Sequence, residues 1–379
     1  MRSAYTRQVK TGVAAFAVVA AMSGLAACGS DDPSGASDDS AGSAATVPAE
    51  VEATVTKYLG EAELGLEPLS AKPEPGKHVI YLANSKAPTD VTNGEYVMEA
   101  VETLGWTGDT INYEGDPASL SEALDQAVNE KPDAVVLSGQ DPSAYANSLK
   151  KAGEAGVPVF VGGVPVAPEG MDKGGLTGVS LGSEFLTVEG AVSADWIIRD
   201  SGGTANVAVV TLAGFPTLEA EHKGFADELK KNCPSCKEQV VEVQISEIGK
   251  GVPATVVSTL QANPDIDYVY FPYGDVSIGV PAALAAANLN PKVTSSIASD
   301  NTYGDLKSGK AVMTMSTSSA VQGWLEVDLV ARYFETNAPV HNESAPLKVY
   351  DETNSQADTL PISPEDYEDQ FKKAWLLTS

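Results

Sequence analysis

Residues 131–161, KPDAVVLSGQDPSAYANSLKKAGEAGVPVFV, are the stretch that decides the fold. Its two apolar runs, 134–138 and 157–161, are short and rich in valine, which is typical of strands buried on both faces. Between them, residues 142–155 are predicted to form a helix. A strand, a helix and a second strand in this order predict two parallel strands joined by a helix that covers the sheet.

The same alternation continues in both directions from this stretch. Toward the N-terminus the sequence predicts strands over 78–83 and 110–113, followed by helical stripes over 97–104 and 120–128. Toward the C-terminus a strand at 176–181 opens a second series, with helices over 186–200, 218–231, 253–262 and 276–288 and strands over 207–210, 240–243, 268–271 and 293–297. We therefore predict an α/β protein with two doubly wound parallel-sheet lobes, joined by a multi-strand hinge, with a ligand cleft between them.

The order of these elements also predicts how the chain is divided. We expect an N-terminal lobe from residues 77–182 plus 317–343, a C-terminal lobe from 183–316 plus 344–360, and a C-terminal helix over 361–379. In parallel sheets ligands bind beyond the carboxyl ends of the strands. Both sets of strand ends can therefore face one cleft.

The first thirty residues have the features of a bacterial export signal. Arg2, Arg7 and Lys10 precede an apolar run over 13–21, which is too short to span a bilayer. The residues that follow, LAACG at 25–29, resemble a lipobox, in which the cysteine is lipidated and becomes the first mature residue. The alternative is an ordinary signal peptide that happens to carry a cysteine. The agreement of charge, length and spacing favours the lipobox.

This resemblance implies where the protein resides. Residues 1–27 would be a lipoprotein signal peptide, and Cys28 would carry the lipid that anchors the chain to the extracytoplasmic face of the cell membrane. Residues 29–50 contain Gly, Ser, Ala and Asp but no large apolar side chain. Such a stretch buries too little surface to fold, so we predict a flexible tether over residues 28–76.

Composition limits the partners of the chain. The 52 acidic residues outnumber the 24 basic ones, and removal of the signal peptide takes away three more basic residues. Phosphate backbones and anionic lipids both require basic surface, so we expect no nucleic acid partner and no membrane binding by charge. We expect a monomer without a cofactor.

The cysteines and histidines point away from metal and redox chemistry. Cys233 and Cys236 form a close pair that we interpret as a structural disulfide, because the compartment is oxidising. A thioredoxin-like redox pair is the alternative. The three histidines, His78, His222 and His341, lie far apart without ligand spacing, so no zinc site is predicted.

The sequence also lacks the common signatures of hydrolases and nucleotide-binding enzymes. Neither a G-x-S-x-G elbow nor a phosphate-binding G-x-x-x-x-G-K-[ST] loop is present. We therefore predict that the chain is not an enzyme. A carboxylate pair for glycoside hydrolysis remains the alternative.

Several local motifs resemble one family in order and spacing. They are KPDAVVLS at 131–138, DPSA at 141–144, AGEAGVPV at 152–159, KGF at 223–225, NPDIDYVY at 263–270 and IASDN at 297–301. Over residues 77–350 the chain resembles the type I periplasmic binding proteins, in the ribose-binding branch that serves ABC importers. The resemblance implies capture of a small molecule by lobe closure and delivery to an ABC transporter permease. Presentation to a membrane receptor is the alternative.

The resemblance also implies which residues contact the ligand. Family positions for a stacking aromatic pair fall at Thr89 and Asp90, a sugar-binding Asp-Arg pair falls at Gly162 and Gly163, and an arginine is replaced by Glu221. Without these groups a typical pyranose is not expected, whereas a polyol, an amine-bearing solute or a less polar molecule is. The ligand-binding set implied is Thr89, Asp90, Gln140, Gly163, Glu221, Tyr273, Asp275, Asp300 and Thr317. Alternatively, stacking is supplied by Phe185, Phe215, Tyr273, Tyr303 or Trp324.

The lipobox leads to a direct test. Replacement Cys28→Ser removes the thiol that would receive the lipid, so the protein should be released from the membrane or accumulate as unprocessed precursor. Fractionation and intact-mass measurement of exported protein decide between these results. A variant that is processed normally and still sediments with the membrane would contradict the tether.

Overall fold

The computed structural model describes residues 47–166, 175–342 and 345–378. The predicted signal peptide and Cys28 lie outside these ranges. Within them, no helix combines the length and the apolar character that a membrane span requires.

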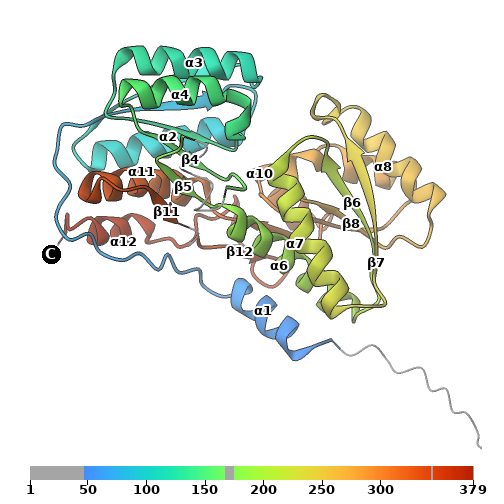
Figure 1. Cartoon of the computed structure of the whole chain (residues 1–379). Helices are drawn as coiled ribbons and strands as arrows, with labels where there is room; N and C mark the ends of the chain where they lie inside the picture. The colour runs from blue at the N-terminus through green and yellow to red at the C-terminus, as the bar shows by residue number, and fades with distance from the viewer. Residues whose placement is uncertain (1–46, 167–174, 343–344, 379) are drawn as a thin grey trace, which may run out of the picture. The chain divides into compact units, whose positions relative to one another are not determined.

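The first lobe is built on a six-stranded sheet in which all neighbouring strands are parallel (Figure 1). In the spatial order β11-β5-β4-β3-β1-β2 its strands are Val340–Asn342, Gly178–Ser180, Val159–Gly162, Ala134–Ser138, His78–Asn84 and Thr107–Tyr113. Helices α2 (Pro88–Thr103) and α11 (Ser319–Thr336) cover one face, and α3 (Pro117–Glu130) and α4 (Ala146–Ala155) cover the other. All five residues of β3 are buried, because helices cover the sheet on both sides.

The second lobe repeats this plan. Its sheet has the order β12-β10-β9-β8-β6-β7, with strands Lys348–Tyr350, Met313–Ser316, Lys292–Ser295, Tyr268–Phe271, Asn206–Leu212 and Lys237–Val243. Only the β10–β12 pair is antiparallel among these. Helices α6 (Ser183–Ser201) and α7 (Pro216–Asn232) cover one face, and α8 (Gly251–Ala262), α9 (Val280–Ala286) and α10 (Asp300–Lys307) cover the other.

These two sheets confirm the predicted fold class. The chain passes from one sheet to the other after β5, after β10 and after β11, which gives the multi-strand connection that the fold requires. Two predicted helices differ in detail. Residues 142–155 form a short 3-10 turn (Pro142–Tyr145) before α4, and 276–288 is divided into a 3-10 turn (Gly274–Ser277) and α9.

The predicted tether over 28–76 is wrong for its second half. Helix α1 (Ala49–Leu59) buries Val51 and Val55 completely and packs on α6. Leu64 and Leu69 are buried as well. The apolar residues after position 50 supply the buried surface that residues 29–50 lack, so the chain is ordered against the fold well before residue 77.

The predicted C-terminal helix over 361–379 is shorter than expected. Helix α12 covers Tyr367–Ala374, and Trp375, directly after it, is fully buried. The Trp375 ring stacks on Trp324 of α11 with a centroid distance of 5.2 Å. The indole Nε1 of Trp375 donates to Asp328 Oδ1 at 2.8 Å, so the chain end is fixed to the first lobe.

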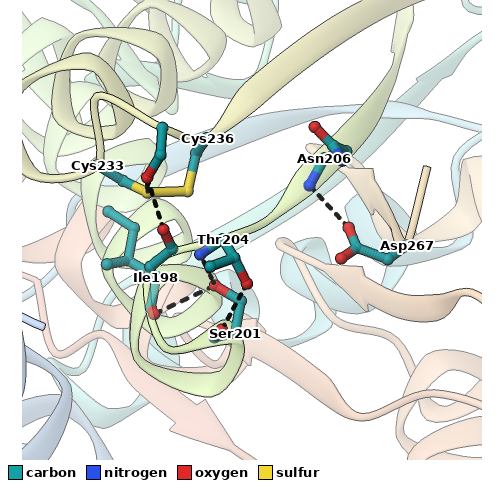
Figure 2. The surroundings of a disulfide bond; sticks show 9 residues. Ile198, Ser201, Thr204, Asn206, Cys233, Cys236 and Asp267 are labelled. Atoms are coloured by element: carbon teal, nitrogen blue, oxygen red, sulfur yellow. Dashed lines mark hydrogen bonds between the residues drawn. A yellow bond between two sulfur atoms is a disulfide. The ribbon is translucent and has the colours of Figure 1, made fainter. Parts of the chain in front are cut away.

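The disulfide prediction is confirmed. Cys233 and Cys236 are bonded at the turn between α7 and β7, beside the end of α6 (Figure 2). Ser235 Oγ, within the same turn, donates to the carbonyl of Gly203 at 2.8 Å. The disulfide thus closes a small loop after α7, and the Ser235 hydrogen bond joins this loop to the chain that follows α6.

Helices α6 and α7 approach each other closely at two glycines. A Cβ on Gly190 would overlap the carbonyl oxygen of Glu221 and lie 2.7 Å from the Phe225 nitrogen. A Cβ on Gly224 would overlap the carbonyl of Thr187. Because these obstacles are backbone atoms, only a shift of a whole helix relieves them.

This packing predicts the effect of adding one methyl group. Gly190→Ala should lower the free energy of unfolding by about 1–3 kcal/mol or more, as overpacking does when backbone must move. The control is Gly153→Ala on α4, where a Cβ meets nothing within 4 Å. That change should be neutral or stabilising by up to ~1 kcal/mol. Urea unfolding of both variants measures the difference, and equal stability would contradict the close contact.

Candidate ligand-binding site

A cavity of about 230 Å³ lies between the two lobes. Loops at the carboxyl ends of strands from both sheets line it, as parallel sheets predict. The first lobe contributes Asn84, Ala87, Thr89, Asp90, Asn93, Ser138, Gly139, Gln140 and Gly163, and α11 adds Ser319 and Gln322. The second lobe contributes Phe185, Leu186, Glu189, Leu212, Phe215, Thr217, Leu218, Ile245, Tyr273, Ile297 and Ala298.

The wall from the first lobe is polar and centred on Asp90. This residue lies in the first turn of α2, and its carboxylate accepts hydrogen bonds from Tyr81 Oη and the Asn84 backbone N–H, both at 2.5 Å. Burial raises the pKa of Asp90 to about 6, although both hydrogen bonds act to lower it. These bonds hold the carboxylate in place at the cavity.

A second carboxyl group, Glu326 of α11, lies completely buried behind this wall. It accepts hydrogen bonds from Ser138 Oγ at 2.6 Å and from Asn93 Nδ2 at 3.0 Å. A Cβ on Gly162 would overlap Glu326 Oε1, so the glycine at the end of β4 makes room for this carboxyl. Burial raises the pKa of Glu326 to about 8.

The wall from the second lobe is mostly apolar. Phe185, Leu186, Leu212, Phe215 and Leu218 face the cavity from α6, the end of β6 and the start of α7. Glu189 of α6 is the exception among them. It is only 3% exposed, and burial raises its pKa to about 8. Within the described part of the chain, the Glu189 carboxyl has no hydrogen-bond partner. Its oxygens are therefore available to a molecule in the cavity.

Glu221, a predicted ligand residue, does not line the cavity. It is fully buried on α7, where Oε1 accepts a hydrogen bond from Tyr270 Oη at 2.6 Å and Oε2 has no partner. Burial and repulsion from Glu189 raise the pKa of Glu221 well above its ordinary range. The structure therefore places it behind Glu189, as a buried neighbour of the site.

The other predicted residues divide between the cavity and its mouth. Thr89, Asp90, Gln140, Gly163, Tyr273 and Thr317 line the cavity. Asp275 and Asp300 line an adjoining hollow of about 780 Å³ that shares Thr89 and Tyr273 with it. Asp275 accepts from Tyr273 Oη at 3.0 Å. Asp300 is exposed at the start of α10, and its Oδ1 accepts from the Leu360 N–H at 3.1 Å.

Three of the five aromatic candidates for stacking reach the cavity. Phe185, Phe215 and Tyr273 line it. Tyr303 and Trp324 do not, because they are buried in edge and stacking contacts with Tyr350 and Trp375. Sequence reasoning missed Asn93, Glu189 and Gln322, which are carried by helices rather than by the loops that the family motifs mark.

The two lobes touch across the cavity. Thr217 Oγ1 of the second lobe donates to the Gly163 carbonyl of the first at 3.3 Å. Tyr273 of the second lobe and Thr89 of the first line the same cavity; burial raises the pKa of Tyr273, and the Thr89 side chain acts to lower it. No cluster of three or more His, Cys, Asp or Glu side chains suited to a metal ion occurs in the described ranges.

Comparison with known proteins identifies the family to which this two-lobed fold belongs. A family model described as a periplasmic binding protein domain matches residues 81–337, more than half of the chain. The chain belongs to the periplasmic binding protein family. Members of this family are extracytoplasmic solute-binding proteins rather than enzymes, which agrees with the prediction from sequence.

Individual relatives of this periplasmic binding protein are distant. It is 25% identical over 185 residues to the ABC transporter periplasmic-binding protein YphF of Escherichia coli, a match that covers 48% of this chain and 55% of YphF. It is 24% identical to the fructose import binding protein FruE of Bifidobacterium longum, covering 75% and 76% of the two chains.

Solved structures show the same fold. A periplasmic ribose ABC transporter protein from Conexibacter woesei superposes with a TM-score of 0.65 at 22% identity, covering 76% of this chain and 95% of that one. A solute-binding protein from Agrobacterium vitis with bound allitol gives 0.64 at 20% identity, with 74% and 97% coverage.

The buried carboxyl groups predict how stability depends on pH. With a pKa of about 8 in the folded chain, Glu326 stays protonated at pH values where the unfolded chain has released that proton. Stability should therefore fall as pH rises from about 5 to about 8, by up to ~1.4 kcal/mol per pH unit for each such group.

The glutamine in Glu326→Gln cannot ionise. The free energy of unfolding of this variant should therefore fall less steeply with rising pH than that of the unaltered protein. Urea unfolding at several pH values measures the slope, and Glu184→Gln, an exposed change on α6, is the control. The same slope in Glu326→Gln and in the unaltered protein would show that Glu326 does not titrate in this range.

Proposed function

We propose that the chain is a lipid-anchored solute-binding protein that captures a small molecule between its lobes and delivers it to an ABC importer. Cys28 carries the lipid and holds the protein at the extracytoplasmic face of the cell membrane, where it acts as a monomer. The observation that carries this proposal is the cavity lined by the strand ends of both sheets. A ligand that touches both walls stabilises the closed arrangement of the lobes.

The cavity lacks the sugar contacts at the family's usual positions, although Phe185, Phe215 and Tyr273 place aromatic rings on its wall. The stacking pair and the Asp-Arg pair are replaced by Thr89, Asp90, Gly162 and Gly163. The remaining choices are a sugar-like molecule, a polyol or another non-pyranose solute. The names of the relatives, which include ribose, fructose and allitol, support a small polar ligand.

The contacts across the cavity support lobe closure. Thr217 of the second lobe donates a hydrogen bond to Gly163 of the first, and Tyr273 of the second lobe faces the same cavity as Thr89 of the first. A bound solute would add further contacts between the same two walls. Binding energy is thus converted into a closed shape that a permease can distinguish from the empty form.

The test does not depend on guessing the ligand. Purified protein, incubated with a deproteinised extract of its own bacterium and desalted, should retain one small molecule that native mass spectrometry detects. A strain lacking the gene should take up that molecule more slowly than its parent. If no extract component binds, or if uptake is unchanged by the deletion, the proposed function is wrong.

A further inference from the structure

We propose that the solute is an amphipathic amine, whose protonated nitrogen lies between Asp90, Asn93 and Glu189 and whose apolar part rests on the second lobe. This inference rests on the proposed function, because it names the ligand class of the same cavity. Three features support it: the acidic groups around the cavity, the buried acceptors without a donor, and the contrast between the polar wall of the first lobe and the apolar wall of the second.

The charge around the cavity favours a cation. No Lys, Arg or His is present among the described residues that line it, whereas Asp90 and Glu189 face it from opposite lobes. Glu326 and Glu221 lie buried behind these two. A ligand carboxylate or phosphate would be desolvated next to acids with no cation to balance it, so anionic solutes are disfavoured.

Two buried acceptors on the walls have no donor from the protein. The first is the carboxyl of Glu189 on the second lobe. The second is Oδ1 of Asn93, a residue that is 3% exposed and whose Nδ2 shares its two N–H groups among Tyr81, Ser138 and Glu326. The buried hydroxyl of Thr317, which also lines the cavity, has no partner among the described residues either and can donate or accept. An ammonium group has three donors and no acceptor, so it can satisfy the free oxygens of Glu189 and Asn93.

The opposite wall suits a ligand with an extended apolar body. A sugar also has C–H faces that can stack on aromatic rings, but the hydroxyls around those faces each need a polar partner. The second lobe offers Phe185, Leu212, Phe215 and Leu218 instead, and the two rings can also attract a nearby cation. The cavity of about 230 Å³ has room for a small ring with a short side arm.

Calorimetry with defined probes tests the ligand class. Phenethylamine and tyramine present an ammonium group on a small aromatic body, 2-phenylethanol replaces the ammonium group by a hydroxyl, and phenylacetate replaces it by a carboxylate. We expect binding of at least one amine, binding at least tenfold weaker for 2-phenylethanol, and none for phenylacetate. D-ribose, D-fructose and allitol complete the panel and should bind more weakly than the amine.

Variants locate the amine. Glu189→Gln should weaken phenethylamine or tyramine binding at least tenfold and leave 2-phenylethanol binding nearly unchanged. Glu184→Gln, an exposed acid on the same helix, is the matched control and should bind like the unaltered protein. Because the Glu189 carboxyl has no protein partner, its replacement should not impair folding, and thermal unfolding of the empty variant checks this.

Proton release gives a second, independent readout. Glu189 faces Glu221 of α7, which is bonded to Tyr270 of β8, and Asp90 lies on the opposite wall. A cation beside Glu189 favours its ionised form, so amine binding at pH 7 should release protons into the buffer. Calorimetry in buffers of different ionisation enthalpy measures this release, which should be reduced in Glu189→Gln.

The outcomes separate this inference from the proposed function. If a sugar or polyol binds and no amine does, the ligand class is wrong while solute binding stands. Amine binding that is unaffected by Glu189→Gln would also overturn the inference. If neither the panel nor the cell extract yields a bound molecule, both proposals fail.

Discussion

The close contact between α6 and α7 is the constraint on which the site depends. Gly190 and Gly224 allow the two backbones to approach within a distance that no side chain would permit. Glu189, next to Gly190, is thereby fixed at the cavity, and Glu221 lies behind it. The position of both carboxyl groups follows from the close packing of α6 on α7. Because this packing buries them away from water, the pKa values of both groups are raised.

The first lobe also buries a carboxyl group, but it surrounds that group with hydrogen-bond donors. Its buried carboxyl, Glu326, is surrounded by donors from Ser138, Asn93 and Gln322, whereas Glu189 has none. A satisfied network orders the side chains of that wall, and Asp90 is similarly held by Tyr81 and Asn84. One wall is thus organised before a ligand arrives, and the other keeps an acceptor free for it.

The sequence predicted the fold better than the site, for a physical reason. Strands such as 134–138 and 268–271 are buried on both faces, so their apolar runs are visible without any tertiary information. Cavity residues on helices are selected by how the helix is rotated against its neighbours, which depends on contacts such as that of Gly190 with Glu221. Alignment of loop motifs therefore found Asp90 and Gln140, misplaced Glu221 and missed Glu189.

The segment before the first strand connects both lobes to the predicted membrane anchor. On the second lobe, Lys348 Nζ donates to the carbonyls of Leu59 and Gly60. On the first, Arg332 donates to the Glu67 carbonyl at 2.6 Å, and Trp106 to that of Glu74 at 2.7 Å. Because the chain is bonded to the second lobe at residues 59–60 and to the first lobe at residue 67, residues 60–67 bridge the two lobes. The lobe closure that we propose would therefore also have to be accommodated by this short segment.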